Sequence, residues 1–243
     1  MSNEFNFWRL KLLMKNNKII ISKSKLFIAI LIPILELIIG GLFIPHISKI
    51  WGKVIFSDIL FFIGFVIAIN LYKDVLKADW KKFKGHLLRN IFFALLGVII
   101  SYVILSLVRI GMKETLSVSE IHYDLLSIST TTASIGVVGS LTSIMAPFTE
   151  EIIFRHTLFY QWRNRGIVTI LMFLLSSFLF GLAHWNNFNG DIFKMIPYMV
   201  VGAWFAIIYY KSKNIWQNIM THFFFDFLQV IAAVVVLILS LIQ

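Results

Sequence analysis

The chain is a succession of long apolar stretches separated by short polar connections. Each stretch has about 20 residues or more, the length that an α-helix needs to cross the hydrocarbon core of a bilayer. The stretches lie at 26–46, 54–72, 90–110, 126–161, 167–185, 192–210 and 214–241. The fourth and the seventh are long enough to be tilted, broken or split into two segments. The pattern therefore predicts an all-α transmembrane bundle of seven helices, or eight if one stretch is split.

The composition supports a membrane protein. Hydrophobic residues make up 59% of the 243 positions and charged residues only 14%, whereas a soluble domain has about 25% charged residues. The connections are too short for a separate soluble domain, which excludes a tethered catalytic head. Because Cys is absent, disulfides, thiol nucleophiles and thiolate metal sites are excluded too. We expect a multi-pass protein of the cell membrane that acts inside the bilayer.

The formal net charge of +10 is concentrated between the apolar stretches. Basic residues in such places meet lipid headgroups, so we expect the lipid bilayer, and no nucleic acid, as a partner. The segment before the first stretch and alternate connections carry sixteen Lys and Arg residues, against five in the other connections. The positive-inside rule then places the N-terminus in the cytoplasm. Residues 1–25 have the pattern of a basic, amphipathic arm at the membrane interface.

The ionisable residues within the apolar stretches are concentrated in the last 100 residues of the chain. We therefore divide the chain into the interfacial arm at 1–25, N-terminal spans at 26–120 and a candidate catalytic region at 121–243. A charge in hydrocarbon costs several kcal/mol unless it is paired or hydrated, so such residues are the first functional candidates. Segment 127–143 is rich in small and hydroxylated residues, which either pack helices closely or line a water-filled cavity.

The first cluster of candidates lies around two consecutive glutamates. Glu151 and Arg155 are four residues apart with the acid first, the favoured spacing for an ion pair on a helix. Glu150 points about 100° away, so it stays free to act on a water or a metal. On this stretch alone, a purely structural Glu–Arg clamp is an equal alternative. Pro147 suits a helix start just before the acids.

The other candidates are two histidines and an aspartate. His222 and Asp226 are also four residues apart, so their side chains can hydrogen-bond on one helix face. A single histidine such as His184 is usually a packed core residue, but together with these groups and Glu150 it can converge on a site in the bundle interior. In straight spans His184 and His222 would differ in depth by more than about 10 Å. A shared site therefore requires a tilted or broken helix.

Three motifs follow one another along the chain, on the fourth, fifth and seventh stretches: EExxxR, FxxxH and HxxxD, at Glu150, Glu151, Arg155, Phe180, His184, His222 and Asp226. In this order they resemble the CPBP family, which comprises CAAX prenyl proteases and bacteriocin-processing enzymes and is also called the Abi family of intramembrane proteases. The resemblance covers about residues 145–230. It departs from the family at Asp226, where asparagine is common, and this adds a negative charge.

The resemblance implies an endopeptidase that cleaves a membrane-embedded peptide or a lipidated, for example prenylated, protein. Carried over by position, Glu150 is the base that activates a water and His184 helps to hold that water. His222 and Asp226 stabilise the oxyanion. Alternatively these four residues hold Zn²⁺ with an open coordination position, and the sequence leaves the metal and the metal-free mechanisms both open.

In the same scheme Glu151 and Arg155 are a structural ion pair. Two other classes of protein compete with the protease. A noncatalytic membrane interaction protein or a bacteriocin self-immunity protein can have the same fold, although such a protein has no need to bury these ionisable groups. A transporter can use intramembrane acids as a proton relay, but the sequence shows no inverted repeat.

Overall fold

The computed structural model describes residues 22–112 and 129–242. Within these ranges the chain is helical and has no strand, which confirms the predicted all-α class. Six helical stretches are long and apolar enough to cross a membrane: Lys23–His46, Ile50–Lys84, Leu87–Gly111, Thr130–Trp162, Ile192–Ser212 and Ile215–Ile242. The chain is thus a multi-pass membrane protein. The stretch expected at 167–185 forms a shorter apolar helix, so the count of seven spans and the cytoplasmic N-terminus stay predictions.

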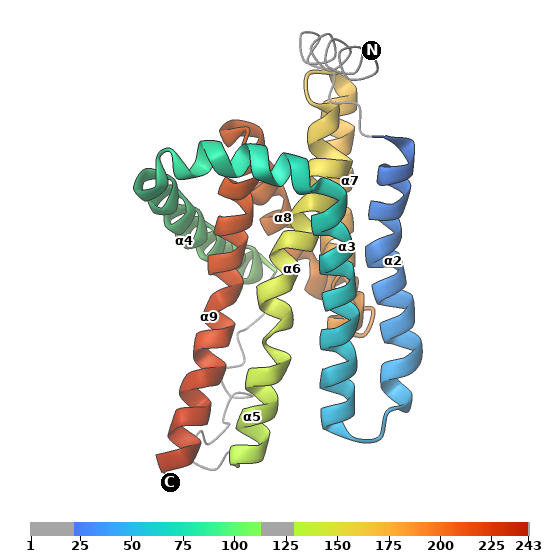
Figure 1. Cartoon of the computed structure of the whole chain (residues 1–243), viewed down its shortest axis with the longest axis vertical. Coiled ribbons are helices and arrows are strands. Elements are labelled where there is room, and N and C mark those ends of the chain that lie inside the picture. Colours follow the sequence, from blue (N-terminus) through green and yellow to red (C-terminus); the bar gives the residue numbers. More distant parts are fainter. Residues whose placement is uncertain (1–21, 113–128, 243) are drawn as a thin grey trace, which may run out of the picture.

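The first two helices stand side by side at one edge of the bundle (Figure 1). Helix α2 (Lys23–Phe43) begins at Lys23. Residues 1–21 of the predicted arm lie outside the described residues, so the arm stays a prediction. Lys25 lies in the first turn of α2, and its Nζ donates to the carbonyl of Leu71, 2.9 Å away in α3 (Ile50–Lys84).

Helix α3 is much longer than the span expected at 54–72. Its backbone leaves helical geometry at Tyr72 (φ −115°, ψ 16°), and beyond this kink it runs across the bundle instead of along it (Figure 1). The expectation of a connection here is wrong. Leu76 and Phe83 are buried on one face of the second half, whereas its five lysines are exposed, and this amphipathic pattern stabilises a helix along the membrane surface.

The fourth predicted span is broken, as its length allowed. After α4 (Leu87–Gly111) and the undescribed residues 113–128, it consists of α5 (Thr130–Gly139), α6 (Thr142–Glu150) and a π-helical segment, η4 (Glu151–Phe159). Pro147 lies inside α6 and not at a helix start, which corrects the prediction, because the break after Gly139 already starts the helix. The proline removes one backbone hydrogen bond just ahead of the change to π-helix, a geometry that is frequent at functional sites.

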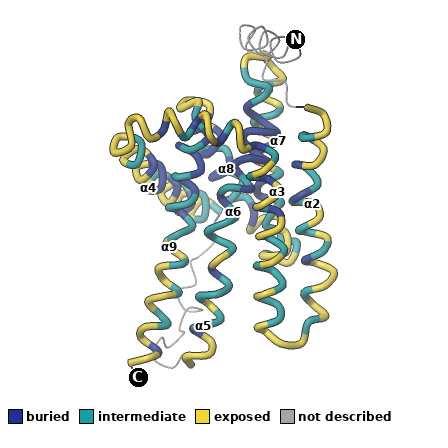
Figure 2. The backbone as a smooth tube through the Cα atoms, viewed as in Figure 1, coloured by how far each residue is buried: buried dark blue, intermediate teal, exposed yellow. Residues whose placement is uncertain are grey.

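Helices α7 (Ile167–Leu182), α8 (Ile192–Ser212) and α9 (Ile215–Ile242) complete the bundle. Helices α7 and α8 approach closely, since a Cβ on Gly181 would lie 2.2 Å from Cγ of Met199. Buried residues gather where α6, α7, α8 and the first half of α9 meet, while the outer faces are largely exposed (Figure 2). These outer faces are apolar, as contact with lipid requires. The buried core instead contains ionisable groups, including Glu151, Arg155 and His222.

Candidate active site

A cavity of about 870 Å³ lies in the interior of the bundle and is lined by all four predicted catalytic residues, Glu150, His184, His222 and Asp226. The expected difference in depth between the two histidines does not arise. Helix α7 is short, and His184 lies two residues after its end. The ring of Phe180 contacts the imidazoles of His184 and His222, with centroid distances of 5.3 and 5.7 Å. The fold therefore brings the three motifs together.

His222 is fixed by the second glutamate of the EExxxR motif. Its Nδ1 lies 2.8 Å from Oε1 of Glu151, so its other nitrogen faces the two remaining carboxylates. Nε2 is 3.4 Å from Oδ2 of Asp226 and 3.8 Å from Oε2 of Glu150. His222 and Asp226 do share a face, as their spacing predicted. The shortest contact nevertheless comes from Glu151, which the sequence analysis paired with Arg155 alone.

Arg155 is completely buried and has three partners. Its Nη1 lies 3.2 Å from Oε1 of Glu151, and its Nη2 donates to the carbonyl of Gly202 at 3.2 Å. Its guanidinium carbon lies 3.9 Å from the centre of the Phe180 ring, a distance at which a cation–π attraction contributes. The expected ion pair is present, and because Glu151 also contacts His222, the pair positions the imidazole as well as clamping the helix.

Asn218 belongs to the same network, although the sequence analysis missed it. Its Nδ2 donates to Oε2 of Glu151, so both oxygens of this buried carboxylate are bonded. The signal was present in the sequence, since Asn218, His222 and Asp226 recur every four residues on α9. The ring of Phe205, 4.6 Å from that of His222, completes the packing and has no comparable signal.

The side chains of Glu150 and His184 make no hydrogen bond to the network around Glu151 and can contact a ligand in the cavity. The carboxylate of Glu150 is partly exposed in the cavity and makes no hydrogen bond to any of the described residues. His184 has its Nδ1 3.0 Å from the carbonyl of Phe180, so this nitrogen donates and Nε2 is the acceptor of the neutral ring. The ring packs against Tyr198 with a centroid distance of 4.5 Å.

The wall of the cavity comes partly from the small and hydroxylated segment at 127–143. Five of its residues line the cavity, namely Gly136, Gly139, Ser140, Thr142 and Ser143. Of the two alternatives for this segment, the structure thus supports a cavity wall. From the site the cavity extends along the first half of α3 and the second halves of α4 and α9 to Lys53 and Arg109.

The zinc site predicted at Glu150, His184, His222 and Asp226 is not assembled in this geometry. Among the described residues, no three His, Asp or Glu side chains form a group that could hold a metal ion. We therefore derive no step through a metal, and zinc remains a prediction for experiment.

Comparisons with known proteins bear on the same region. The profile of the family described as Type II CAAX prenyl endopeptidase Rce1-like matches residues 132–228. An uncharacterized protein of Mycoplasma capricolum is 29% identical over 182 residues, which cover 72% of this chain and 52% of that protein. The Bacillus subtilis protein named "Putative membrane peptidase YdiL" is 34% identical over 85 residues, 34% of this chain and 31% of YdiL.

A third relative, the UPF0177 protein YxdF of Lactococcus lactis, is 28% identical over 82 residues, 34% of this chain and 42% of YxdF. The chain thus spans about half the length, or less, of these curated relatives. No solved structure matches it. The matched region holds every residue of the three ordered motifs. The resemblance seen in the motifs is therefore confirmed over residues 132–228, which match the Rce1-like family of type II CAAX prenyl endopeptidases.

Proposed function

We propose that the chain is an intramembrane endopeptidase in which Glu150 activates a water for attack on a peptide carbonyl. The observation that supports this most directly is the free carboxylate of Glu150, which faces Nε2 of His222 across 3.8 Å inside the cavity. This separation exceeds a hydrogen bond, so the Glu150 carboxylate stays available to a water. Nε2 of His222 has Asp226 at 3.4 Å as its nearer neighbour and can turn its proton to the substrate carbonyl when that group enters the cavity. A purely structural role of the EExxxR motif does not require a carboxylate and an imidazole that face each other across a cavity.

In the proposed reaction, Glu150 removes a proton from the water while the water oxygen bonds to the carbonyl carbon. The protonated form of His222 has two N–H donors: Nδ1–H bonds to Glu151, and Nε2–H bonds to the oxyanion that develops. Nε2 of His184 accepts the second hydrogen of the water and orients it. The C–N bond then breaks as Glu150 returns its proton to the leaving nitrogen, which regenerates the carboxylate.

Asp226 and Glu151 serve His222 from its two sides. Glu151 is bonded to Nδ1 and fixes the orientation of the ring, with Arg155 and Asn218 holding the carboxylate in place. Asp226 lies 3.4 Å from Nε2 and adds negative charge, which favours the protonated imidazole that the oxyanion requires. A carboxylate here performs this task better than the neutral asparagine that is common in the family.

The substrate that best fits this site is a peptide segment that lies in the membrane. The cavity extends toward the end of the bundle where α3 and α5 begin and α9 ends, as far as Lys53, Gly136 and Ala233. The basic half of α3 and residues 211–213 lie toward the other end (Figure 1), which the positive-inside rule places in the cytoplasm. The cavity then opens toward the outer face, so a translocated membrane peptide fits better than a prenylated protein of the cytoplasm.

The deciding experiment replaces Glu150 with Gln, which removes the base and keeps the volume. Peptides released by cells with the wild type and with Glu150→Gln identify the substrate, and a synthetic copy is then given to the purified proteins. We expect cleavage to fall about 10²–10⁴-fold, the range for loss of a general base. Asp74→Asn is the control, because it also replaces a carboxylate by an amide but at an exposed position that does not line the cavity. Retained cleavage by Glu150→Gln contradicts the mechanism.

A further inference from the structure

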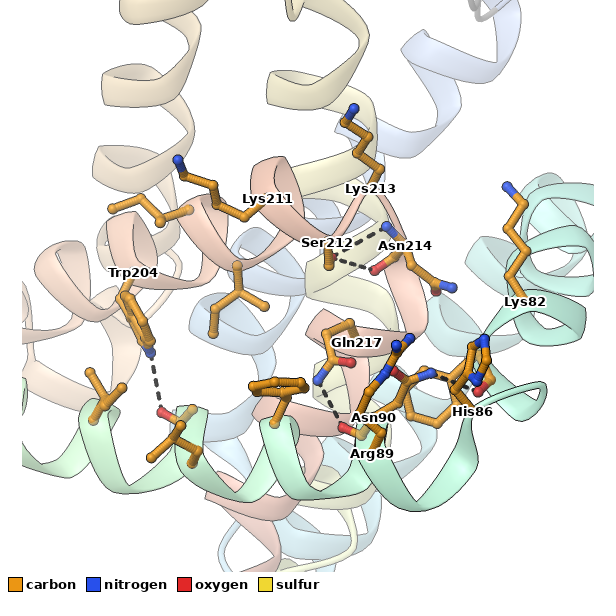
Figure 3. Close-up of a pocket in the computed structure, with 17 residues that line it drawn as sticks. Lys82, His86, Arg89, Asn90, Trp204, Lys211, Ser212, Lys213, Asn214 and Gln217 are labelled. Carbon is orange, nitrogen blue, oxygen red and sulfur yellow. Dashed lines mark hydrogen bonds between the residues drawn. The ribbon is translucent and has the colours of Figure 1, made fainter.

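A second hollow, of about 740 Å³, lies between the end of α3, the start of α4, the end of α8 and the start of α9. It shares no lining residue with the catalytic cavity. Figure 3 shows its basic side chains, Lys82, Arg89, Lys211 and Lys213, arranged around one rim together with His86. These residues come from two connections that are far apart in the sequence and that the fold brings together.

The charge of this rim is not balanced by acids. None of the residues that line the hollow is Asp or Glu. Lys82 alone has an acidic partner, Asp79 at 3.1 Å, whereas the side chains of Arg89, Lys211 and Lys213 make no ion pair or hydrogen bond with the described part of the chain. The exposed cations therefore create a positive potential at the mouth of the hollow, which attracts an anion.

The walls of the hollow are held in place by hydrogen bonds between helices. Nε1 of Trp204 on α8 donates to the carbonyl of Gly97 on α4 at 3.1 Å, and Nε2 of Gln217 on α9 donates to that of Asn90 at 3.0 Å. Both bonds are drawn in Figure 3. Helices α4, α8 and α9 thus form a preformed site, and a ligand need not order them.

Below the basic rim the lining is apolar. Phe93, Leu96 and Ile100 of α4 face Ile207 and Ile208 of α8 across the hollow. Phe93, Leu96 and Ile207 are well exposed, so in a bilayer they meet acyl chains. A ligand that uses the whole hollow has an anionic head beside the lysines and a hydrocarbon tail on this floor. A free inorganic anion uses only the rim.

We propose that this hollow is a binding site for an anionic phospholipid, with the phosphate at Arg89, Lys211 and Lys213 and one acyl chain along the floor. The second half of α3 carries five exposed lysines and ends at the hollow, which Lys82 and Phe83 line. This arrangement places the rim at the level of the headgroups. The site is independent of the proposed peptidase activity. Its occupant anchors the turn between α8 and α9, the two helices that carry Gly202 and His222.

The test compares lipid retention by the purified full chain. The protein is placed in nanodiscs of phosphatidylcholine with a small fraction of phosphatidylglycerol, then released, and its retained lipids are measured by native mass spectrometry. The variant is Arg89→Ala/Lys211→Ala. The matched control is Lys81→Ala/Lys84→Ala, which removes two exposed lysines of the same region that do not line the hollow.

We expect the wild type and the control to retain phosphatidylglycerol selectively, and the variant to lose this selectivity by about tenfold or more, as removal of two headgroup contacts implies. Thermal stability in pure phosphatidylcholine serves as a check, since the substituted side chains are exposed and should leave it unchanged. Equal retention by variant and control overturns the site. Stabilisation of the protein by inorganic phosphate in pure phosphatidylcholine, equal to that by phosphatidylglycerol, also overturns it.

Discussion

Replacing Arg155 by Ala tests the buried network most severely, because the arginine is the fully buried, permanently charged partner of Glu151. The substitution removes the 3.2 Å contact with Glu151, the hydrogen bond to the carbonyl of Gly202 and the stacking on Phe180. Breaking one partner of a buried ion pair costs about 3–5 kcal/mol, since the other charge stays in a low dielectric. Glu151 is 0% exposed, so water cannot replace the guanidinium.

The assay is thermal unfolding of the purified protein in detergent. For a chain of this size, 1 kcal/mol shifts the Tm by about 2–4 °C, so we expect a decrease of about 6–20 °C for Arg155→Ala. Arg165→Ala is the matched control, because Arg165 is exposed and its loss should change the free energy of unfolding by less than about 0.5 kcal/mol.

Two further variants separate charge from packing. Arg155→Met keeps most of the apolar volume but still leaves Glu151 charged, so it should remain strongly destabilised. Glu151→Gln/Arg155→Met removes both charges and should be more stable than Arg155→Met alone. A double-mutant cycle measures this difference as the coupling free energy between the two side chains. If Arg155→Ala is as stable as Arg165→Ala and yet inactive, the arginine acts in the reaction and the structural argument fails.

The remaining predictions concern the metal and the side of access. If zinc is bound, Asp226→Asn should weaken metal affinity about 10–100-fold, measured as metal content and activity after chelation; full activity of metal-depleted wild type removes zinc from the mechanism. Because the chain has no Cys, single cysteines report access cleanly. Lys53→Cys at the cavity should react with an impermeant maleimide in intact cells, whereas Arg165→Cys should react only after lysis. The reverse labelling pattern contradicts an outward-facing cavity.

The sequence by itself determined the class of the molecule and indicated the candidate residues of its site. Apolar stretches of membrane length form helices in a bilayer, because the backbone polar groups must be bonded within the segment. The ionisable residues Glu150, His184, His222 and Asp226 could be selected as candidates because each is costly in hydrocarbon. The i,i+4 pair of Glu151 and Arg155 could be predicted as well, since it depends only on local helix geometry.

Tertiary structure alone decided how these groups meet. The contact of Glu151 with His222 spans 71 residues, and no local periodicity encodes it. Phe180 contacts Arg155 and both imidazoles, although these residues lie on three different segments of the chain. The kink at Tyr72 turned an expected connection into a surface helix, since burial of its apolar face outweighed the charge of its lysines. The basic hollow likewise arose from two distant connections that packing brought to one end of the bundle.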